Sequence, residues 1–209
     1  INRAGAEISC RAAKDKAYVF GSIGPTGKML FTGEVGETEL SEGFEEQASA
    51  LADGGVHGIV IETMSELDEA KLALRAARKT GLPVVVSMVY DSGQEFDRTM
   101  MGTTPEEAAQ QLKNEGADVI GANCGMGMEF ILPVCKRLRA ATDLPVWIKP
   151  NAGMPEYVNG KIMYNITPAQ FATYAVKVRE AGANFIGGCC GTNPDFIREL
   201  KISLGKKGQ

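Results

Sequence analysis

The sequence has no apolar run of about 18 residues, the length that a membrane-spanning helix needs, and no charged-then-apolar leader opens the chain. It also has no basic block, and its 22 lysines and arginines are outnumbered by 26 aspartates and glutamates. These absences argue against a membrane or a nucleic acid as the main partner. We therefore expect a cytoplasmic protein that acts on a small molecule.

The cysteine pattern argues against structural disulfides. Five cysteines are an odd number, and a chain of 209 residues with 44% apolar content can bury a core without covalent staples. Cys189 and Cys190 are adjacent, and a disulfide between them would close a strained ring. Reduced thiols or metal ligands are the expectation.

Apolar runs alternate with helical patterns along the chain. The runs that predict strands are Tyr18–Gly24, Gly58–Thr63, Val84–Val89, Val119–Cys124, Val146–Asn151 and Phe185–Cys189. The helical patterns between and after them cover about 41–54, 66–80, 104–116 and 129–142, a stretch that starts at Thr167, and 194–204. Continuous apolar runs are typical of parallel strands covered on both faces, and repeated strand–helix units predict an α/β fold.

Two α/β architectures compete. Six strands would complete a doubly wound sheet, whereas a (β/α)8 barrel needs two more. The chain opens with a helical pattern over Ile1–Lys16 that no strand precedes, and no linker divides the sequence. We predict a single domain over residues 1–209, a (β/α)8 TIM-type barrel that lacks its first two strands. The tail from Gly205 to Gln209 is expected to be frayed.

In such a barrel the active site lies at the carboxyl ends of the strands. The residues expected there are Gly24-Pro25-Thr26, Glu62-Thr63, Ser87, Asn123-Cys124, Pro150-Asn151 and Cys189-Cys190. Adjacent side chains of an extended strand point to opposite faces, so Cys189 and Cys190 can reach one ligand only if the backbone leaves strand geometry. The flanking glycines permit that departure.

Three of the five cysteines, Cys124, Cys189 and Cys190, therefore fall on the predicted active face. Three converging thiolates form a soft site suited to zinc, and an open fourth position is the mark of a catalytic zinc. A thiol substrate in that position would lose its proton on coordination. Because three thiolates already neutralise the ion, the site favours alkylation of a thiol over hydrolysis.

Four motifs resemble the homocysteine S-methyltransferase family, and the resemblance covers essentially the whole chain. They are Gly21-Ser22-Ile23-Gly24-Pro25-Thr26-Gly27, Gly121-Ala122-Asn123-Cys124, Pro150-Asn151-Ala152-Gly153 and Gly188-Cys189-Cys190-Gly191-Thr192. The resemblance implies a zinc-dependent (β/α)8 barrel that methylates homocysteine to methionine. It also implies that Cys124, Cys189 and Cys190 bind zinc and that Glu62 holds the ammonium group of the substrate.

The first of these motifs most resembles the homocysteine module of cobalamin-dependent methionine synthases. That likeness implies methylcobalamin, carried on another module or corrinoid protein, as the methyl donor. Related free-standing enzymes take the methyl group from betaine or S-methylmethionine. The family's opening strand, with its Asp-Gly-Ala-Met-Gly-Thr type of motif, and its second strand have no counterpart in this sequence, and they supply part of the homocysteine pocket.

Ser87, Asn123 and Asn151 are further candidates for substrate binding, although the two asparagines could equally bond loop backbone. Cys10 and Cys135, each on a predicted helix, are expected to pack as small apolar residues.

Two other functions stay open. Gly187-Gly188 ahead of the Asn193-Pro194 helix start is also typical of a phosphate-binding barrel enzyme. The chain could instead be a structural zinc domain or an inactive zinc-binding fragment.

Overall fold

The computed structural model describes residues 1–205, so residues 206–209 of the predicted frayed tail lie outside the described residues. One parallel sheet contains β1 (Phe20–Ile23), β2 (Gly58–Met64), β3 (Val84–Met88), β4 (Val119–Cys124), β5 (Val146–Pro150) and β8 (Phe185–Ile186). The helices are α1 (Asn2–Ala13), the 3-10 turn η1 (Lys14–Lys16), α2 (Glu37–Asp53), α3 (Leu67–Arg78), α4 (Pro105–Asn114), α5 (Met128–Ala141), α6 (Pro168–Glu180) and α7 (Pro194–Gly205). None of these helices is long and apolar enough to cross a membrane.

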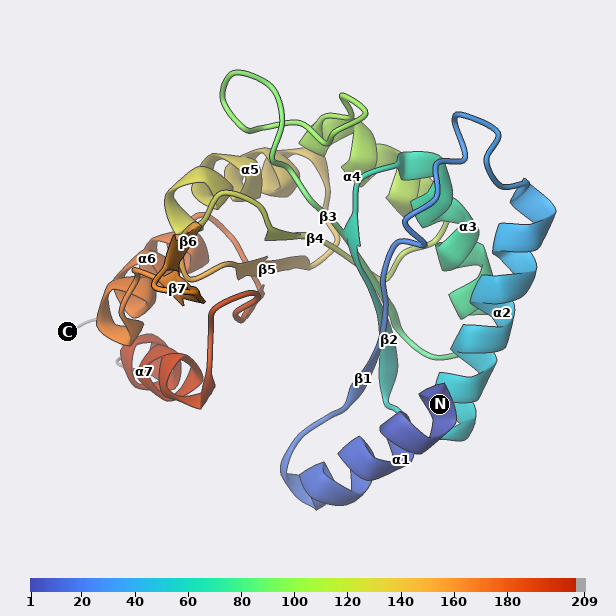
Figure 1. Ribbon diagram of the computed structural model, residues 1–209, viewed down its shortest axis with the longest axis horizontal. Coiled ribbons are helices and arrows are strands. Elements are labelled where there is room, and N and C mark those ends of the chain that lie inside the picture. The colour runs from blue at the N-terminus through green and yellow to red at the C-terminus, as the bar shows by residue number, and fades with distance from the viewer. Residues whose placement is uncertain (206–209) are drawn as a thin grey trace.

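The sheet has the topology of a barrel. Its strands are ordered β1-β2-β3-β4-β5-β8, each paired with its neighbours in parallel, with no reversal of order. A doubly wound sheet reverses its strand order and carries helices on both faces. Here the sheet curves into an arc with the helices along its outer side (Figure 1). The barrel prediction is therefore confirmed over the doubly wound alternative.

Side chains alternate between the two faces of each strand. The outward side chains pack against the helices and form the main core, whose fully buried members include Ile23, Ile59, Ile61, Val86, Ile148, Leu74 and Phe171. On the concave face, the Trp147 ring lies 5.8 Å from Phe20 and 5.4 Å from Phe185 between centroids. Apolar residues on both faces explain why the strands read as continuous apolar runs.

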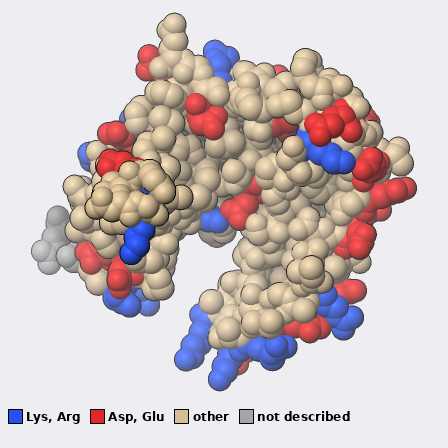
Figure 2. Space-filling model, in the orientation of Figure 1, with Lys and Arg blue, Asp and Glu red and all other residues tan. Residues whose placement is uncertain are grey.

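Figure 2 shows that the concave face opens into a hollow between the two arms of the arc, with an acidic and a basic patch side by side at its head. The carboxyl ends of the strands border this hollow, so the fold presents the predicted strand-end residues to solvent from several strands at once.

Two sequence predictions about strands were wrong. The last strand ends at Ile186 rather than at Cys189, because the backbone leaves strand geometry from Gly187 onward. Between the strand predicted at Val146–Asn151 and the helix start at Thr167, where no strand was predicted, lies an antiparallel hairpin, β6 (Pro155–Val158) and β7 (Lys161–Tyr164). Its turn is Asn159-Gly160, with φ of 50° and 80°, the positive values that a type I′ turn requires. That dipeptide was the signal for the hairpin.

The sequence predicted the start of α4 correctly and the start of α2 too late. The helix predicted from residue 104 is capped by Thr104, which accepts a hydrogen bond from the Glu107 amide. The Glu107 side chain accepts from Gln111 instead of completing a capping box. α2 begins at Glu37, four residues before the predicted Ser41. Glu37 and Glu39 in its first turn stabilise that earlier start, because carboxylates favour the positive end of a helix dipole.

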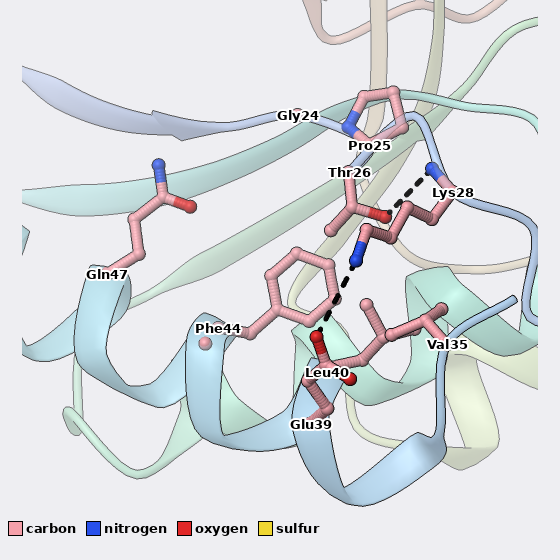
Figure 3. Close-up of a pocket in the computed structure, with 10 residues that line it drawn as sticks. Gly24, Pro25, Thr26, Lys28, Val35, Glu39, Leu40, Phe44 and Gln47 are labelled. Carbon is pink, nitrogen blue, oxygen red and sulfur yellow. Dashed lines mark hydrogen bonds and ion pairs between the residues drawn. The ribbon is translucent and has the colours of Figure 1, made fainter.

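Glu69 anchors the loop that follows β1. Its Oε1 accepts hydrogen bonds from the Thr26 amide at 2.8 Å and from the Thr26 hydroxyl at 2.7 Å, and the residue is 2% exposed. On the other side of this loop a cavity of about 410 Å³ separates it from α2, where Lys28 Nζ lies 3.6 Å from Glu39 Oε1 (Figure 3). A buried side chain therefore fixes the loop from beneath.

Replacing Glu69 by alanine is expected to lower the free energy of unfolding by about 1–3 kcal/mol, because it leaves two Thr26 donors without their acceptor. Glu69→Gln is the matched control: it keeps Oε1 and should change stability by less than half as much. Urea unfolding at neutral pH measures both. Equal stability of Glu69→Ala and the wild type would show that the anchor contributes nothing.

Candidate metal and substrate site

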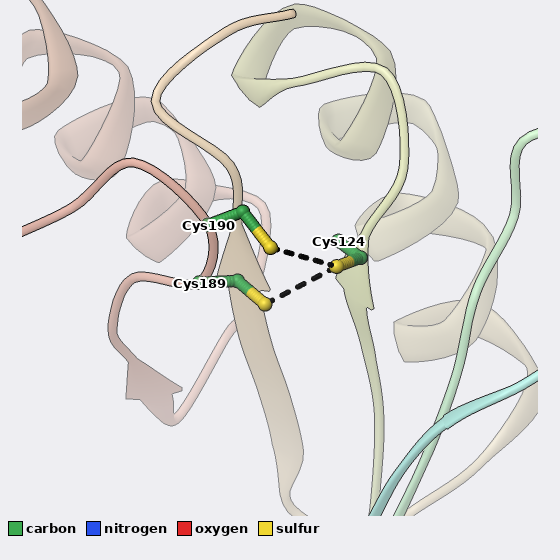
Figure 4. A group of neighbouring side chains, drawn as sticks. All are labelled: Cys124, Cys189 and Cys190. Atoms are coloured by element: carbon green, nitrogen blue, oxygen red, sulfur yellow. Dashed lines mark hydrogen bonds between the residues drawn. The ribbon is translucent and has the colours of Figure 1, made fainter. Parts of the chain in front are cut away.

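Three thiols meet where β4 ends, at Cys124, and in the turn that follows β8, at Cys189 and Cys190 (Figure 4). The Cys124 sulfur lies 3.2 Å from that of Cys189 and 3.7 Å from that of Cys190, and all three sulfurs lie within 4.8 Å of one another. Two thiolates bound to one tetrahedral zinc at 2.3 Å are about 3.8 Å apart. The structure thus brings together the three cysteines that the sequence singled out, at separations that fit one ion.

The backbone around these thiols is held in unusual conformations. Cys124 has φ of 60°, a left-handed conformation that is uncommon outside glycine. In the turn after β8, a methyl group at Gly188 would lie 2.5 Å from the Thr192 side chain, and one at Gly191 would lie 2.3 Å from the Tyr164 ring. Glycines are therefore required for the turn that points two adjacent thiols to one place, as the sequence suggested for Cys189 and Cys190.

The thiols lie so close together that the pKa values of Cys124 and Cys189 shift in opposite directions. A hydrogen bond from Cys124 favours the Cys189 thiolate and lowers the pKa of Cys189 to about 5. The same shared proton, together with burial, raises the pKa of Cys124 well above its ordinary value. The cluster accepts one negative charge readily and resists a second, so a bound cation is what would allow all three sulfurs to be thiolates.

The Asn123 side chain lies against the Cys189 sulfur and is held by hydrogen bonds to Thr63 and Ser87. Its Oδ1 accepts from the Thr63 amide at 2.9 Å and from the Ser87 hydroxyl at 2.7 Å, while its Nδ2 donates to the Thr63 hydroxyl at 2.8 Å and lies 3.8 Å from the Cys189 sulfur. Asn123 is 1% exposed and Ser87 is fully buried. Of these two predicted substrate residues, neither has a side chain open to the hollow.

Thr63 was expected at the carboxyl end of its strand, but the sequence assigned it no role. It has φ of 65°, which is rare for a β-branched residue, and it lies at an irregularity in the pairing of β2 with β3. Its two hydrogen bonds to Asn123 hold that strained backbone in place. The strained Thr63 backbone therefore helps to position Asn123, which lies against the Cys189 sulfur.

Asn151 joins the two loops that carry the thiols. Its Nδ2 donates to the Gly125 carbonyl at 2.9 Å, and its Oδ1 accepts from the Cys190 amide at 3.1 Å. The residue is 8% exposed. Of the two possibilities for the asparagines, bonding of loop backbone is what the structure displays for Asn151.

Glu62 lies on the concave face with two partners. The Ser22 hydroxyl donates to its Oε1 at 2.7 Å, and the Lys149 ammonium contacts its Oε2 at 2.8 Å. Sequence reasoning placed Glu62 at a strand end, whereas β2 continues to Met64, and it missed Lys149. The available signal was a lysine inside the otherwise apolar strand β5, where a charge needs a partner.

The other two cysteines, Cys10 and Cys135, lie outside the cluster. Cys135 is fully buried in the core, and burial raises its pKa to about 11, while Cys10 is half-buried on α1 with its sulfur 3.2 Å from the Gly55 carbonyl. Both therefore pack as expected.

The Gly187–Gly188 segment gives little support to a phosphate site. The amides of Gly187 and Cys189 donate to the carbonyls of Ile148 and Pro150, at 3.0 and 2.9 Å, so they are not free to bind an anion.

The affinity for zinc that the cysteine cluster is predicted to have should fall about 10-fold in Gly191→Ala, without removal of a ligand, because the added methyl group must displace the Tyr164 ring and disfavours a φ of 78°. Gly43→Ala, in the middle of α2 with no atom within 4 Å of the new methyl group, is the control and should leave affinity unchanged. Competition with a chromophoric chelator measures both. Wild-type affinity in Gly191→Ala would contradict the role of the turn.

Comparison with known proteins matches the chain to one protein family. Residues 1–204 match the family model described as Homocysteine S-methyltransferase. The chain is 28% identical over 219 residues to a methionine synthase of Mycobacterium leprae and 29% identical over 217 residues to one of Mycobacterium tuberculosis. These alignments cover 99% and 98% of this chain but 18% of each relative, so the chain spans less than a fifth of their length.

Two crystal structures of the homocysteine methyltransferase MmuM from Escherichia coli have a similar fold. The apo form matches with a TM-score of 0.72 at 22% identity, over 96% of this chain and 70% of that one. The metallated form matches with a TM-score of 0.67 at 24% identity, over 96% and 66%. At these identities the likeness concerns the fold.

Proposed function

Because the chain belongs to the homocysteine S-methyltransferase family, we propose that it takes part in transfer of a methyl group to the thiol of homocysteine, giving methionine. The observation that carries the proposal is the convergence of Cys124, Cys189 and Cys190, whose sulfurs lie within 4.8 Å of one another. Such a soft donor set, with room for a fourth ligand, suits the binding of a substrate thiol.

Zinc is the metal that these residues would hold, and when bound it lowers the pKa of a coordinated substrate thiol so that a thiolate is available at neutral pH. The three cysteines supply the ligands. Asn123, backed by Ser87 and Thr63, orients the Cys189 sulfur, and Asn151 keeps the two cysteine-bearing loops in register. We therefore assign Asn123, Ser87 and Asn151 to positioning of the thiols, which revises the expectation that they contact substrate.

Glu62 is proposed to hold the ammonium group of homocysteine. Its carboxylate faces the hollow, it is partly exposed, and each of its oxygens keeps a lone pair beyond the contacts to Ser22 and Lys149. A thiol bound at the cysteines and an ammonium bound at Glu62 would fix both ends of the substrate side chain.

Methylcobalamin on a separate module is the methyl donor that we propose. Support comes from the relatives named methionine synthase, of which this chain matches less than a fifth. A cytoplasmic location is proposed as well, because the five cysteines are free in the structure and the site needs reduced thiols.

The experiment that tests the function uses the protein loaded with cobalt(II) in place of zinc. Addition of L-homocysteine should intensify the sulfur-to-cobalt charge-transfer absorption, because one more thiolate joins the metal. L-homoserine, which has a hydroxyl in place of the thiol, is the control and should leave the spectrum unchanged. A spectrum that does not respond to homocysteine would overturn the proposal and favour a structural metal domain.

A further inference from the structure

The ion pair between Glu62 and Lys149 crosses the concave face of the sheet. The two residues belong to β2 and β5, which are separated by β3 and β4 in the sheet order, yet Lys149 Nζ lies 2.8 Å from Glu62 Oε2. The side chains of Lys149 and Glu62 are 21% and 18% exposed, which makes this the most enclosed ion pair of the described part of the chain. The pair is thus built into the hollow.

The pair also lies directly beside the thiols. Lys149 is in register with Asn123, and the next pair along the strands is Cys124 with Pro150. Thr63, the residue after Glu62, is held by Asn123, and the Pro150 carbonyl accepts from the Cys189 amide at 2.9 Å. Glu62 and Lys149 therefore each lie one residue before a residue, Thr63 or Pro150, that bonds to the residues carrying or positioning the sulfurs.

A neighbouring glycine leaves space for the Lys149 side chain at this position. The Lys149 Cγ would lie 3.2 Å from a methyl group at Gly187, so the glycine directly after β8 makes room for the stem of the lysine. Its ammonium lies 5.8 Å over the Trp147 ring. A half-enclosed ion pair is a poor source of stability, because desolvation offsets most of the attraction. Its position in the site suggests recognition instead.

We propose that Lys149 binds the carboxylate of the amino acid substrate, while Glu62 binds its ammonium group. This inference rests on the proposed function and adds a specificity-determining residue to it. The ammonium and carboxylate of homocysteine are attached to one carbon, so they can add to the Glu62–Lys149 pair as a ring of alternating charges. No charge is left without a partner, and Lys149 has two N–H donors beyond the one that faces Glu62.

The proposal predicts which thiols bind. A thiol that lacks the carboxylate or the ammonium loses one of the two charged contacts, so the site selects amino acid thiols over simple ones. Three probes separate the contacts: L-homocysteine, 3-aminopropanethiol, which lacks the carboxylate, and 4-mercaptobutanoate, which lacks the ammonium.

The test measures binding of the three probes by calorimetry to zinc-loaded wild type, Lys149→Met and Lys149→Arg. For Lys149→Met, affinity for homocysteine and for 4-mercaptobutanoate should fall about 10- to 100-fold, while affinity for 3-aminopropanethiol falls less than about 3-fold. Lys149→Arg keeps the charge and should recover part of the loss. Lys201→Met, an exposed lysine on α7, is the matched control. Thermal unfolding of each variant checks that the fold is retained.

The outcomes distinguish the two proposals. If the wild type binds none of the probes, the proposed function fails and this inference fails with it. If the wild type binds homocysteine but Lys149→Met weakens all three probes equally, Lys149 is only structural. If Lys149→Met binds homocysteine as tightly or more tightly, Lys149 merely occupies Glu62 in the free protein. Either of the last two results overturns the inference and leaves the proposed function standing.

Discussion

Replacing Cys189 by serine is expected to lower the affinity of the protein for zinc by at least about 100-fold. Loss of an outer-shell partner alone typically costs 10- to 100-fold in metal affinity, and this change removes a ligand. Serine has nearly the same shape, but its hydroxyl stays protonated near neutral pH and is a harder donor than a thiolate. Cys189 is central to the cluster, because it contacts both Cys124 and Asn123.

The measurement is a competition between the protein and a chromophoric chelator at fixed pH, combined with metal content after dialysis. Cys190→Ser should behave in the same way, with less effect on folding because Cys190 is exposed. Cys10→Ser is the matched control, since Cys10 lies on α1 outside the cluster. Full zinc content in Cys189→Ser or Cys190→Ser would end the assignment of this cluster as the metal site.

The second large effect concerns the substrate. Glu62→Gln is expected to weaken homocysteine binding about 10- to 100-fold, because it removes the charge that pairs with the substrate ammonium and leaves Lys149 without its partner. Glutamine keeps an oxygen that can accept from the Ser22 hydroxyl, so the strand end should hold its shape. Zinc affinity should change by less than about 3-fold, since Glu62 does not touch the sulfurs.

Calorimetric titration with L-homocysteine checks this expectation, and Glu180→Gln, an exposed carboxylate on α6, is the control. The probe without an ammonium group, 4-mercaptobutanoate, should not show the same loss. If Glu62→Gln binds homocysteine with wild-type affinity, the ammonium of the substrate is held elsewhere and Glu62 only pairs with Lys149.

The position of the thiols could be predicted because it depends on strand order. Parallel strands place their carboxyl ends at one edge, so Cys124 and the pair Cys189-Cys190 had to lie on the same face once the strands were counted. The bounds of β4 were also predictable, since an apolar run ends at Cys124 directly before Gly125. These features follow from periodicity and topology, which the sequence encodes locally.

The roles of the polar residues could not be predicted, because they depend on loop conformation. Whether Asn151 bonds backbone or substrate is decided by where Gly125 and the Cys190 amide lie, and the left-handed backbone of Thr63 has no sequence signature. Ser87 stands at a strand end but beneath Asn123, where it is fully buried. The partner of Glu62 required knowing that β2 and β5 face each other across the arc.

The chain-ordered sheet has a consequence for how the protein folds. Each pairing in the sheet joins strands that follow one another along the chain with one helix between them. The exception is β5 with β8, whose connection also contains the hairpin β6–β7. Within the described residues no pairing joins β1 to β8. Each of these pairings therefore requires closure only of an intermediate-length loop, whose entropy cost grows slowly with length. Because Cys189 and Cys190 follow β8, the thiol cluster is complete only once β8 has paired with β5.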